Sequence, residues 1–149
     1  MSIKNKAFIG GIYEHPTRKA IDKSVSQLHA ESAAGALADA GLSIEDVDAY
    51  YCAGDSPGLG PLSMIDYMGL KNVRHMDSTE TGGSSYVVHV GHAAQAIAMG
   101  KANVALITLA GRPRADGMAT GTAPRNYDSS APDVPFEFIY GPTVVNMYA

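Results

Sequence analysis

The sequence holds one cysteine and no tryptophan among its 149 residues, and charged residues make up only 17% of it. A single cysteine cannot form an internal disulfide, which fits a reducing compartment. No uninterrupted apolar run approaches the roughly 18 residues that a membrane-spanning helix needs. The net charge of −4 lacks the basic excess of a nucleic-acid-binding protein. Since the amino-terminal residues also lack an apolar signal region, the sequence predicts a cytoplasmic globular protein.

Charge is missing altogether from one stretch of the chain. Between Thr81 and Gly100 there is no Asp, Glu, Lys or Arg. A helix without a charged residue on any face is normally buried on all sides. A domain of this size has little room for such a helix, so the stretch predicts cover from a larger protein or from a large interface.

Short apolar runs alternate with longer helical patterns along the first 111 residues. This alternation is typical of an α/β fold with a parallel sheet and crossover helices. Gly41 supplies a left-handed helix end, and Ser43 with an acid three residues later predicts one helical turn. The predicted strands are 7–12, 47–53, 73–78 and 103–110, and the predicted helices are 18–40, 62–70 and 82–100.

The character of the chain changes after Gly111. Residues 112–142 are rich in Pro, Gly and Asp, which predicts a long excursion, and 144–149 read as the opening of a further helix. We therefore predict two parts, residues 1–111 and 112–149. We also expect the chain to stop within its loop region.

The order of these segments resembles the first half of the thiolase superfamily fold. The resemblance is carried by ALADAGLSIEDVDAYYCAG at 36–54 and by AAQAIAMGKANVALI at 93–107. The segments GGSSYVVHVGHAAQAIAMG at 82–100 and FEFIYGPTVVNMYA at 136–149 look most like the lipid-transfer-protein branch, the sterol-carrier-type thiolases.

This resemblance implies a thiolase-like α/β fold in which a βαβαβ unit occurs twice. The chain would hold the first copy and the start of the loop region over the coenzyme A site. The resemblance further implies a homodimer, a small OB-fold and zinc-ribbon partner protein, and a coenzyme A thioester as substrate, with no permanently bound cofactor. The acid–base residues of the family are expected outside this chain, which alone would be inactive.

Thiolases use a cysteine at a helix amino terminus as their nucleophile, because the helix end favours the thiolate. Matching the helix of that family without gaps to 93–100 assigns the nucleophile position to Gly83, which has no side chain. Shifting the match to Ser84 or Glu80 restores no thiol. The only cysteine, Cys52, lies on a predicted strand, where we expect a small buried apolar residue. The sequence therefore predicts no acyl-cysteine intermediate.

Other residues near this helix are candidates for binding. Gly83, Ser84 and Ser85 could present N–H groups to a thioester or enolate oxygen, and ordinary serine capping is the alternative. Tyr86 could border the substrate channel.

Three arginines follow the last predicted strand. Arg112, Arg114 and Arg125 could meet the coenzyme A phosphates, with a solvated loop face as the alternative.

Two histidines lie three residues apart on the charge-free helix. His89 and His92 have a spacing that could place two metal ligands on one face. No third ligand is nearby, so packed histidines are the favoured interpretation and we predict no metal site.

Three functions stay open at this point. The first is aldol-type carbon–carbon cleavage of an acyl-CoA with a lipid or steroid side chain. The second is a non-catalytic acyl-CoA-binding or scaffolding subunit, and the third is a conventional acetyl-CoA acyltransferase. Only the third requires an active thiol.

Overall fold

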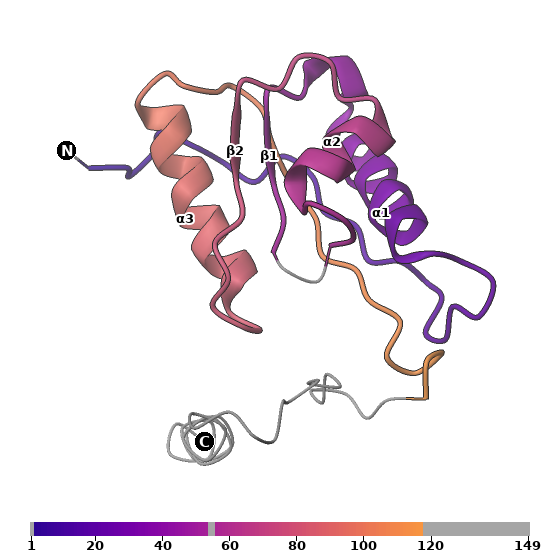
Figure 1. Ribbon diagram of the computed structural model, residues 1–149. Helices are drawn as coiled ribbons and strands as arrows, with labels where there is room; N and C mark the ends of the chain where they lie inside the picture. Colours follow the sequence, from indigo (N-terminus) through magenta and orange to yellow (C-terminus); the bar gives the residue numbers. More distant parts are fainter. Residues whose placement is uncertain (1, 54–55, 118–149) are drawn as a thin grey trace, which may run out of the picture. The chain divides into compact units, whose positions relative to one another are not determined.

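Three short parallel strands form the centre of the computed structural model, which describes residues 2–53 and 56–117 (Figure 1). The strand order is β2-β1-β3, and in this register Tyr50 pairs with Met76 on one side and with Leu106 on the other. The parallel sheet predicted from the sequence is confirmed. The strands are β1 (Ala49–Tyr51), β2 (His75–Asp77) and β3 (Ala105–Ile107).

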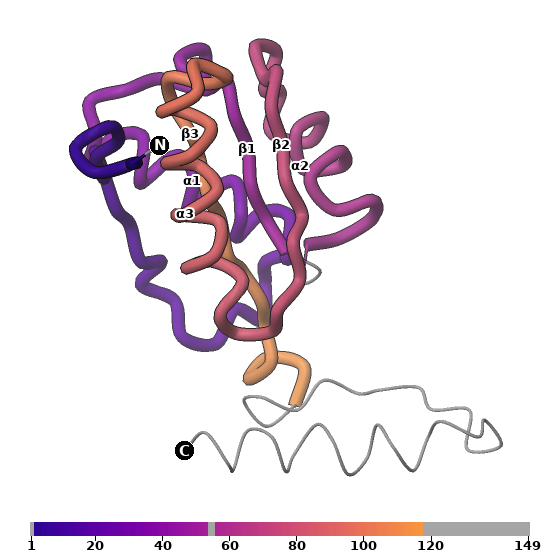
Figure 2. The backbone as a smooth tube through the Cα atoms, turned by 90° about the vertical axis from the view of Figure 1, so that its left-hand side faces the viewer, coloured from indigo at the N-terminus to yellow at the C-terminus, as the bar shows by residue number. Residues whose placement is uncertain are grey.

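Helices cover both faces of this sheet, and Figures 1 and 2 agree on the arrangement. Helix α3 lies on one face, and helices α1 and α2 lie on the other. The side chains of β1 alternate accordingly, since Tyr50 packs toward α1 and α2 while Tyr51 packs toward α3. The helices are α1 (Val25–Ala40), α2 (Pro61–Met68) and α3 (Ser85–Ala98), with a 3₁₀ turn at Ile44–Asp46.

The two hydrophobic clusters differ in the size of their side chains. The cluster on the α3 face is built mostly from alanines, which let the helix approach the sheet closely, and the opposite cluster holds larger groups. The α3 cluster comprises Ala49, Tyr51, Ala93, Ala96 and Ala102; the opposite cluster comprises Ala33, Leu37, Val47, Tyr50, Cys52, Met64, Leu70 and Leu106.

The ends of α1 follow from local hydrogen bonding. The helix was expected to begin near residue 18, but it begins at Val25 because the Ser24 hydroxyl accepts the N–H of Gln27 at 3.0 Å. At the other end, Gly41 adopts φ 68° and its N–H bonds the carbonyls of the last turn. The predicted glycine end is confirmed, but the predicted start was wrong, because the helix begins at Val25 and not near residue 18.

The predicted strand at 7–12 was wrong. No strand forms there, and Phe8, Ile9 and Ile12 are exposed. The segment lies against α1 instead: the Ile12 N–H donates to an Asp39 carboxylate oxygen at 2.9 Å. Gly11 allows this close approach, because a Cβ there would lie 2.7 Å from the backbone nitrogen of Ala40 in α1.

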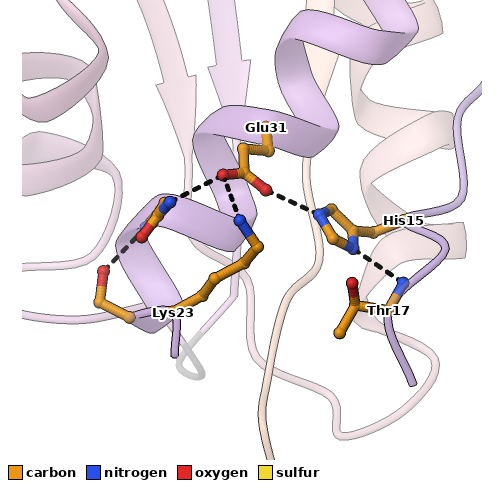
Figure 3. A network of polar contacts seen from close by, with 6 residues as sticks. His15, Thr17, Lys23 and Glu31 are labelled. Carbon is orange, nitrogen blue, oxygen red and sulfur yellow. Dashed lines mark hydrogen bonds and ion pairs between the residues drawn. The ribbon is translucent and has the colours of Figure 1, made fainter. Parts of the chain in front are cut away.

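A carboxylate network holds the residues before α1 onto that helix (Figure 3). Glu31 accepts from Lys23 at 2.9 Å and from Gln27 at 2.8 Å, and it faces His15 at 2.7 Å. Because the Thr17 N–H donates to His15 Nδ1 at 3.1 Å, the hydrogen of that ring is on Nε2 and points to Glu31. The bonds from Lys23, His15 and Gln27 lower the pKa of Glu31 from 4.5 to about 2.

One buried carboxylate joins the amino ends of the three strands. Asp48, just before β1, accepts the backbone N–H groups of Asn103 and Val104 at 2.9 Å each, and Arg74 donates to it at 2.7 Å. Burial alone would raise the pKa of Asp48, but these hydrogen bonds outweigh it and the pKa is lowered. The sheet is thus fixed at its amino edge, opposite the edge where β2 leads into α3.

Candidate functional site at the amino end of α3

The chain turns sharply between β2 and α3. Gly82 takes φ 70°, a conformation that side-chain-bearing residues rarely adopt. Ser84 occupies the N-cap position, but its side chain makes no capping bond and donates instead to the Thr81 carbonyl at 3.0 Å. Ordinary capping by Ser84, the alternative considered for this serine, is therefore not what the structure shows.

The side chains of Ser85 and Glu80 hold this turn by hydrogen bonds to its backbone. The Ser85 hydroxyl is fully buried, accepts the Thr81 N–H at 2.8 Å, and lies 2.7 Å from the Gly82 carbonyl. A carboxylate oxygen of Glu80 accepts the Gly82 N–H at 2.7 Å and lies 3.1 Å from the Ser85 hydroxyl. A negative group thus already stands at the helix amino end, where the helix dipole favours it.

Gly83 is different from its neighbour. Among residues 2–53 and 56–117, a Cβ built there meets no atom within 4 Å, and its φ lies outside the left-handed region. A side chain at this position would point into open space. The position that the resemblance assigns to a nucleophile is therefore open, and packing does not require a glycine there.

The single thiol lies elsewhere in the fold. Cys52 directly follows β1 and is fully buried in the cluster on the α1 and α2 face, away from α3. Its sulfur donates to the Ser56 hydroxyl at 3.2 Å, which in turn donates to the Ala53 carbonyl. The prediction of a small buried residue at Cys52 is confirmed.

Aromatic rings gather beneath the first turns of α3. His89 is fully buried, with ring centroids 5.9 Å from both Tyr51 and Tyr86. Within 2–53 and 56–117, neither nitrogen of His89 has a hydrogen-bond partner, nor does the Tyr51 hydroxyl. Burial, with the nearby charges of Asp77 and Asp48, raises the pKa of Tyr51, so its hydroxyl stays protonated. Tyr86, predicted to border a channel, is half-buried against His89.

The second histidine of α3 pairs with a carboxylate that sequence reasoning missed. His92 Nδ1 bonds an oxygen of Asp77, the last residue of β2, which also accepts from the Thr79 hydroxyl at 2.9 Å. Burial raises the pKa of Asp77, but the bonds from His92, Thr79 and the backbone outweigh it and the pKa is lowered. The sequence signal for this pair was an acid near the carboxyl end of a predicted strand, because the chain passes from that end into the helix that carries His92.

The two histidines therefore have different surroundings, one between tyrosine rings and one on a carboxylate. In the described part of the chain, no three His, Cys, Asp or Glu side chains are grouped to hold a metal. None of the helices described there is long and apolar enough to cross a bilayer.

The predicted coenzyme A arginines fall in three situations. Arg112 donates to the Lys23 carbonyl and, at 2.7 Å, to Asp116, so its guanidinium has partners within the fold. Arg114 is exposed. Arg125 lies outside the described residues, as does the proposed loop region beyond residue 117. The phosphate role of these arginines stays a prediction.

Comparison with known proteins places this geometry in a fold class. No protein-family model and no curated protein matches the chain. Among solved structures, it is similar to an Ltp2-ChsH2(DUF35) aldolase at 25% identity and TM-score 0.68, over 93% of this chain and 33% of that one.

Two further solved structures share the fold. They are 3-oxoacyl-[acyl-carrier-protein] synthase III from Aquifex aeolicus VF5 (20% identity, TM-score 0.51, 58% of this chain and 29% of that one) and Xanthomonas campestris OleA H285D (19%, 0.51, 58% and 26%). The chain has a thiolase-like fold. It spans a third or less of the length of each of these proteins.

Proposed function

We propose that this chain is part of an enzyme that cleaves a carbon–carbon bond of acyl-CoA substrates by aldol-type chemistry, without an acyl-cysteine intermediate. The observation that carries the proposal is Gly83, an open position without a side chain at the amino end of α3. The similarity to a protein named as an aldolase, over 93% of the chain, supports it.

The proposed chemistry needs no covalent bond to the protein. A base removes the proton of a β-hydroxyl group, the bond between the α and β carbons breaks, and the β carbon becomes a carbonyl. The electron pair passes to the α carbon as an enolate of the thioester, which then takes up a proton. Acyl transfer, by contrast, requires a nucleophile that bonds the acyl group.

The turn before α3 offers a place for the enolate oxygen. Donors at a helix amino end stabilise developing negative charge. The Gly82 N–H now bonds Glu80, so a thioester oxygen bound there would take the place of that carboxylate. The Glu80 side chain would then be released close to the reacting carbons.

The finer substrate class and the partners belong to the same proposal. A lipid or steroid side chain as the acyl group follows from the resemblance to the sterol-carrier-type branch. A homodimer, and a second protein comparable to the ChsH2(DUF35) named with Ltp2, would cover the outward face of α3. Val87 and Val90 of α3 are exposed, as is Met99 directly after the helix.

The test is a product assay on the full-length protein. A β-hydroxyacyl-CoA with a tertiary β-hydroxyl group is incubated with the protein. The products are then separated by chromatography and identified and quantified by mass spectrometry. The expected result is a shortened acyl-CoA and a ketone in equal amounts, unchanged after alkylation of thiols. The same acyl-CoA without the hydroxyl group is the matched control and should stay intact.

The two alternatives give other results in the same assay. A binding or scaffolding subunit would retain the acyl-CoA without turnover. A conventional acyltransferase would release free coenzyme A in a reaction that thiol alkylation stops. Either result would overturn the proposal.

A further inference from the structure

One carboxylate lies at the amino end of α3, next to the position without a side chain. An oxygen of Glu80 accepts the Gly82 N–H at 2.7 Å and lies 3.1 Å from the Ser85 hydroxyl. Glu80 is exposed, so its carboxylate can turn away from the backbone. Among the described residues, a Cβ at Gly83 meets no atom within 4 Å. The turn therefore holds a movable carboxylate beside room for the carbons of a substrate.

The Gly82 N–H already binds a negatively charged oxygen. Its bond to the Glu80 carboxylate, at 2.7 Å, has the short length of a charge-assisted hydrogen bond. The enolate oxygen of a thioester carries the same kind of charge, and a donor fixed in position stabilises it. The Glu80 oxygen thus stands where the enolate oxygen would bind.

Bonds that do not involve Glu80 also hold this turn. The Ser85 hydroxyl accepts the Thr81 N–H at 2.8 Å and lies 2.7 Å from the Gly82 carbonyl. The Ser84 hydroxyl donates to the Thr81 carbonyl at 3.0 Å. Because these bonds remain when the carboxylate leaves, the Gly82 N–H stays in place as a donor.

The other acids and imidazoles between residues 77 and 98 are less well placed for the reaction. His89 has 0% exposure, so no substrate atom reaches its ring. His92 and Asp77 bond each other. His92 also lies seven residues after Ser85, about 10 Å along the helix axis. Of these groups, Glu80 is the proton acceptor at the turn itself.

We propose that Glu80 is the acid–base residue of the cleavage, released for this role when the thioester oxygen of the substrate displaces it from the Gly82 N–H. The inference rests on the proposed function, because it names the base that this reaction needs. It places that base within this chain, whereas the resemblance implied acid–base residues outside it.

The steps balance with a single carboxylate. Glu80 takes the proton of the β-hydroxyl group, the bond between the α and β carbons breaks, and the β carbon becomes a carbonyl. The electron pair forms the enolate, whose oxygen accepts the Gly82 N–H. Glu80 then gives the proton to the α carbon and returns to its ionised form. No oxidant, reductant or added reactant enters.

The kinetic test changes the carboxylate to an amide in the full-length protein. Glu80→Gln keeps an oxygen for the Gly82 N–H but cannot take up the proton. The kcat for cleavage of the β-hydroxyacyl-CoA should fall at least about 100-fold, the lower bound for positioned acid–base catalysis. KM should not rise, because a neutral amide competes for the N–H less strongly than a carboxylate does. Glu45→Gln, an exposed glutamate in the 3₁₀ turn before β1, is the matched control and should keep wild-type kcat.

A rescue experiment separates a catalytic carboxylate from a structural one. Glu80→Ala removes the side chain and leaves space for a small acid. Added formate should raise kcat of this variant at least about tenfold, because it supplies a proton acceptor beside the substrate. In Glu80→Gln the amide fills that space, so formate should have no effect.

Acyl-CoA binding tests the displacement without any turnover. An acyl-CoA that lacks the β-hydroxyl group should bind Glu80→Ala more tightly than wild type, because no carboxylate competes for the Gly82 N–H. The expected Kd is lower by at least about twofold, the lower range for one net hydrogen bond. Calorimetric titration measures it, and an equal or higher Kd would overturn the displacement.

The outcomes separate this inference from the proposed function. An inactive wild-type protein overturns both. An active wild-type protein whose kcat falls less than about 100-fold in Glu80→Gln overturns the role of Glu80 and leaves the proposed function standing. If Glu80→Gln does not fold, the two measurements on Glu80→Ala decide, and a failure of formate to restore activity overturns the role in the same way.

Discussion

Glycines in two regions of this protein have opposite surroundings. Where the amino-terminal segment lies on α1, a Cβ at Gly11 would meet backbone atoms of α1, and a Cβ at Gly35 would lie 2.6 Å from a ring carbon of Tyr13. At the amino end of α3, a Cβ at Gly83 would meet no atom of the described part of the chain within 4 Å. The first region needs its glycines for packing, whereas the second has room for a side chain it does not have.

This difference bears on the chemistry. A glycine enforced by packing says nothing about function, because any side chain would be excluded. At Gly83 the described residues leave room for a side chain, so packing among them does not require the glycine there.

The largest effect is expected for Gly11→Ala. The added carbon would lie 2.7 Å from the Ala40 backbone nitrogen, and a helix backbone atom cannot relieve the clash by changing rotamer as a side chain can. The segment must then separate from α1, at a cost of about 2–3 kcal/mol in the free energy of unfolding. Urea denaturation measures this cost, and a value within about 0.5 kcal/mol of wild type would show that the approach is not tight.

A smaller loss is expected for Gly35→Ala. The clash with the Tyr13 ring is partly offset, because alanine favours the helix by about 1 kcal/mol over glycine. The net loss should be about 1 kcal/mol, since the ring can move. In a Tyr13→Ala background the same change should become neutral or stabilising, and equal losses in both backgrounds would locate the strain elsewhere.

The third prediction concerns pH and the Glu31 network. The pKa of Glu31 is about 2 in the folded protein against an ordinary 4.5, so its ionised form stabilises the fold above about pH 4.5. That contribution is lost as the pH falls from 4.5 toward 2. The stability difference between wild type and Glu31→Gln should therefore shrink across this window, and salt should weaken it.

Urea midpoints of the two proteins, measured from pH 6 down to the acid limit of folding, check this prediction. Asp66→Asn, which changes an exposed acid of α2 outside the network, is the matched control. A constant difference between wild type and Glu31→Gln would show that the network contributes no stability through ionisation.

The smallest effect is expected for Gly83→Ala. With open space around the added carbon, the free energy of unfolding should change by less than about 0.5 kcal/mol, as for an exposed surface site. A loss as large as that of Gly11→Ala would erase the contrast between the two regions.

Sequence reasoning reached the elements whose signals are local. The alternation of strands and helices, the left-handed Gly41 and the turn at Ser43 depend on residues close in the chain, and the structure has them. The strand at 7–12 failed because an apolar run does not reveal whether a sheet or a helix surface receives it. The segment at 7–12 packs on α1 because Gly11, which has no Cβ, allows it to approach the helix backbone closely.

In the candidate site, too, the features with local sequence signals could be predicted and those that depend on packing between distant segments could not. The amino end of the charge-free helix and its glycine could be predicted from the order of residues. The partner of His92 could not, because Asp77 comes from another element and meets the helix only through the fold. Likewise, His89 and His92 shared a spacing typical of metal ligands, and their different surroundings depend on what β1 and β2 place opposite each of them.

The most direct test of the account is the intact mass of the protein after incubation with an acyl-CoA. The account predicts that wild type gains no acyl mass, while Gly83→Cys, with its thiol at the helix amino end, gains one acyl group. An acyl adduct on wild type, on Cys52 or on a serine, would contradict the central claim that this thiolase-like site works without a covalent intermediate.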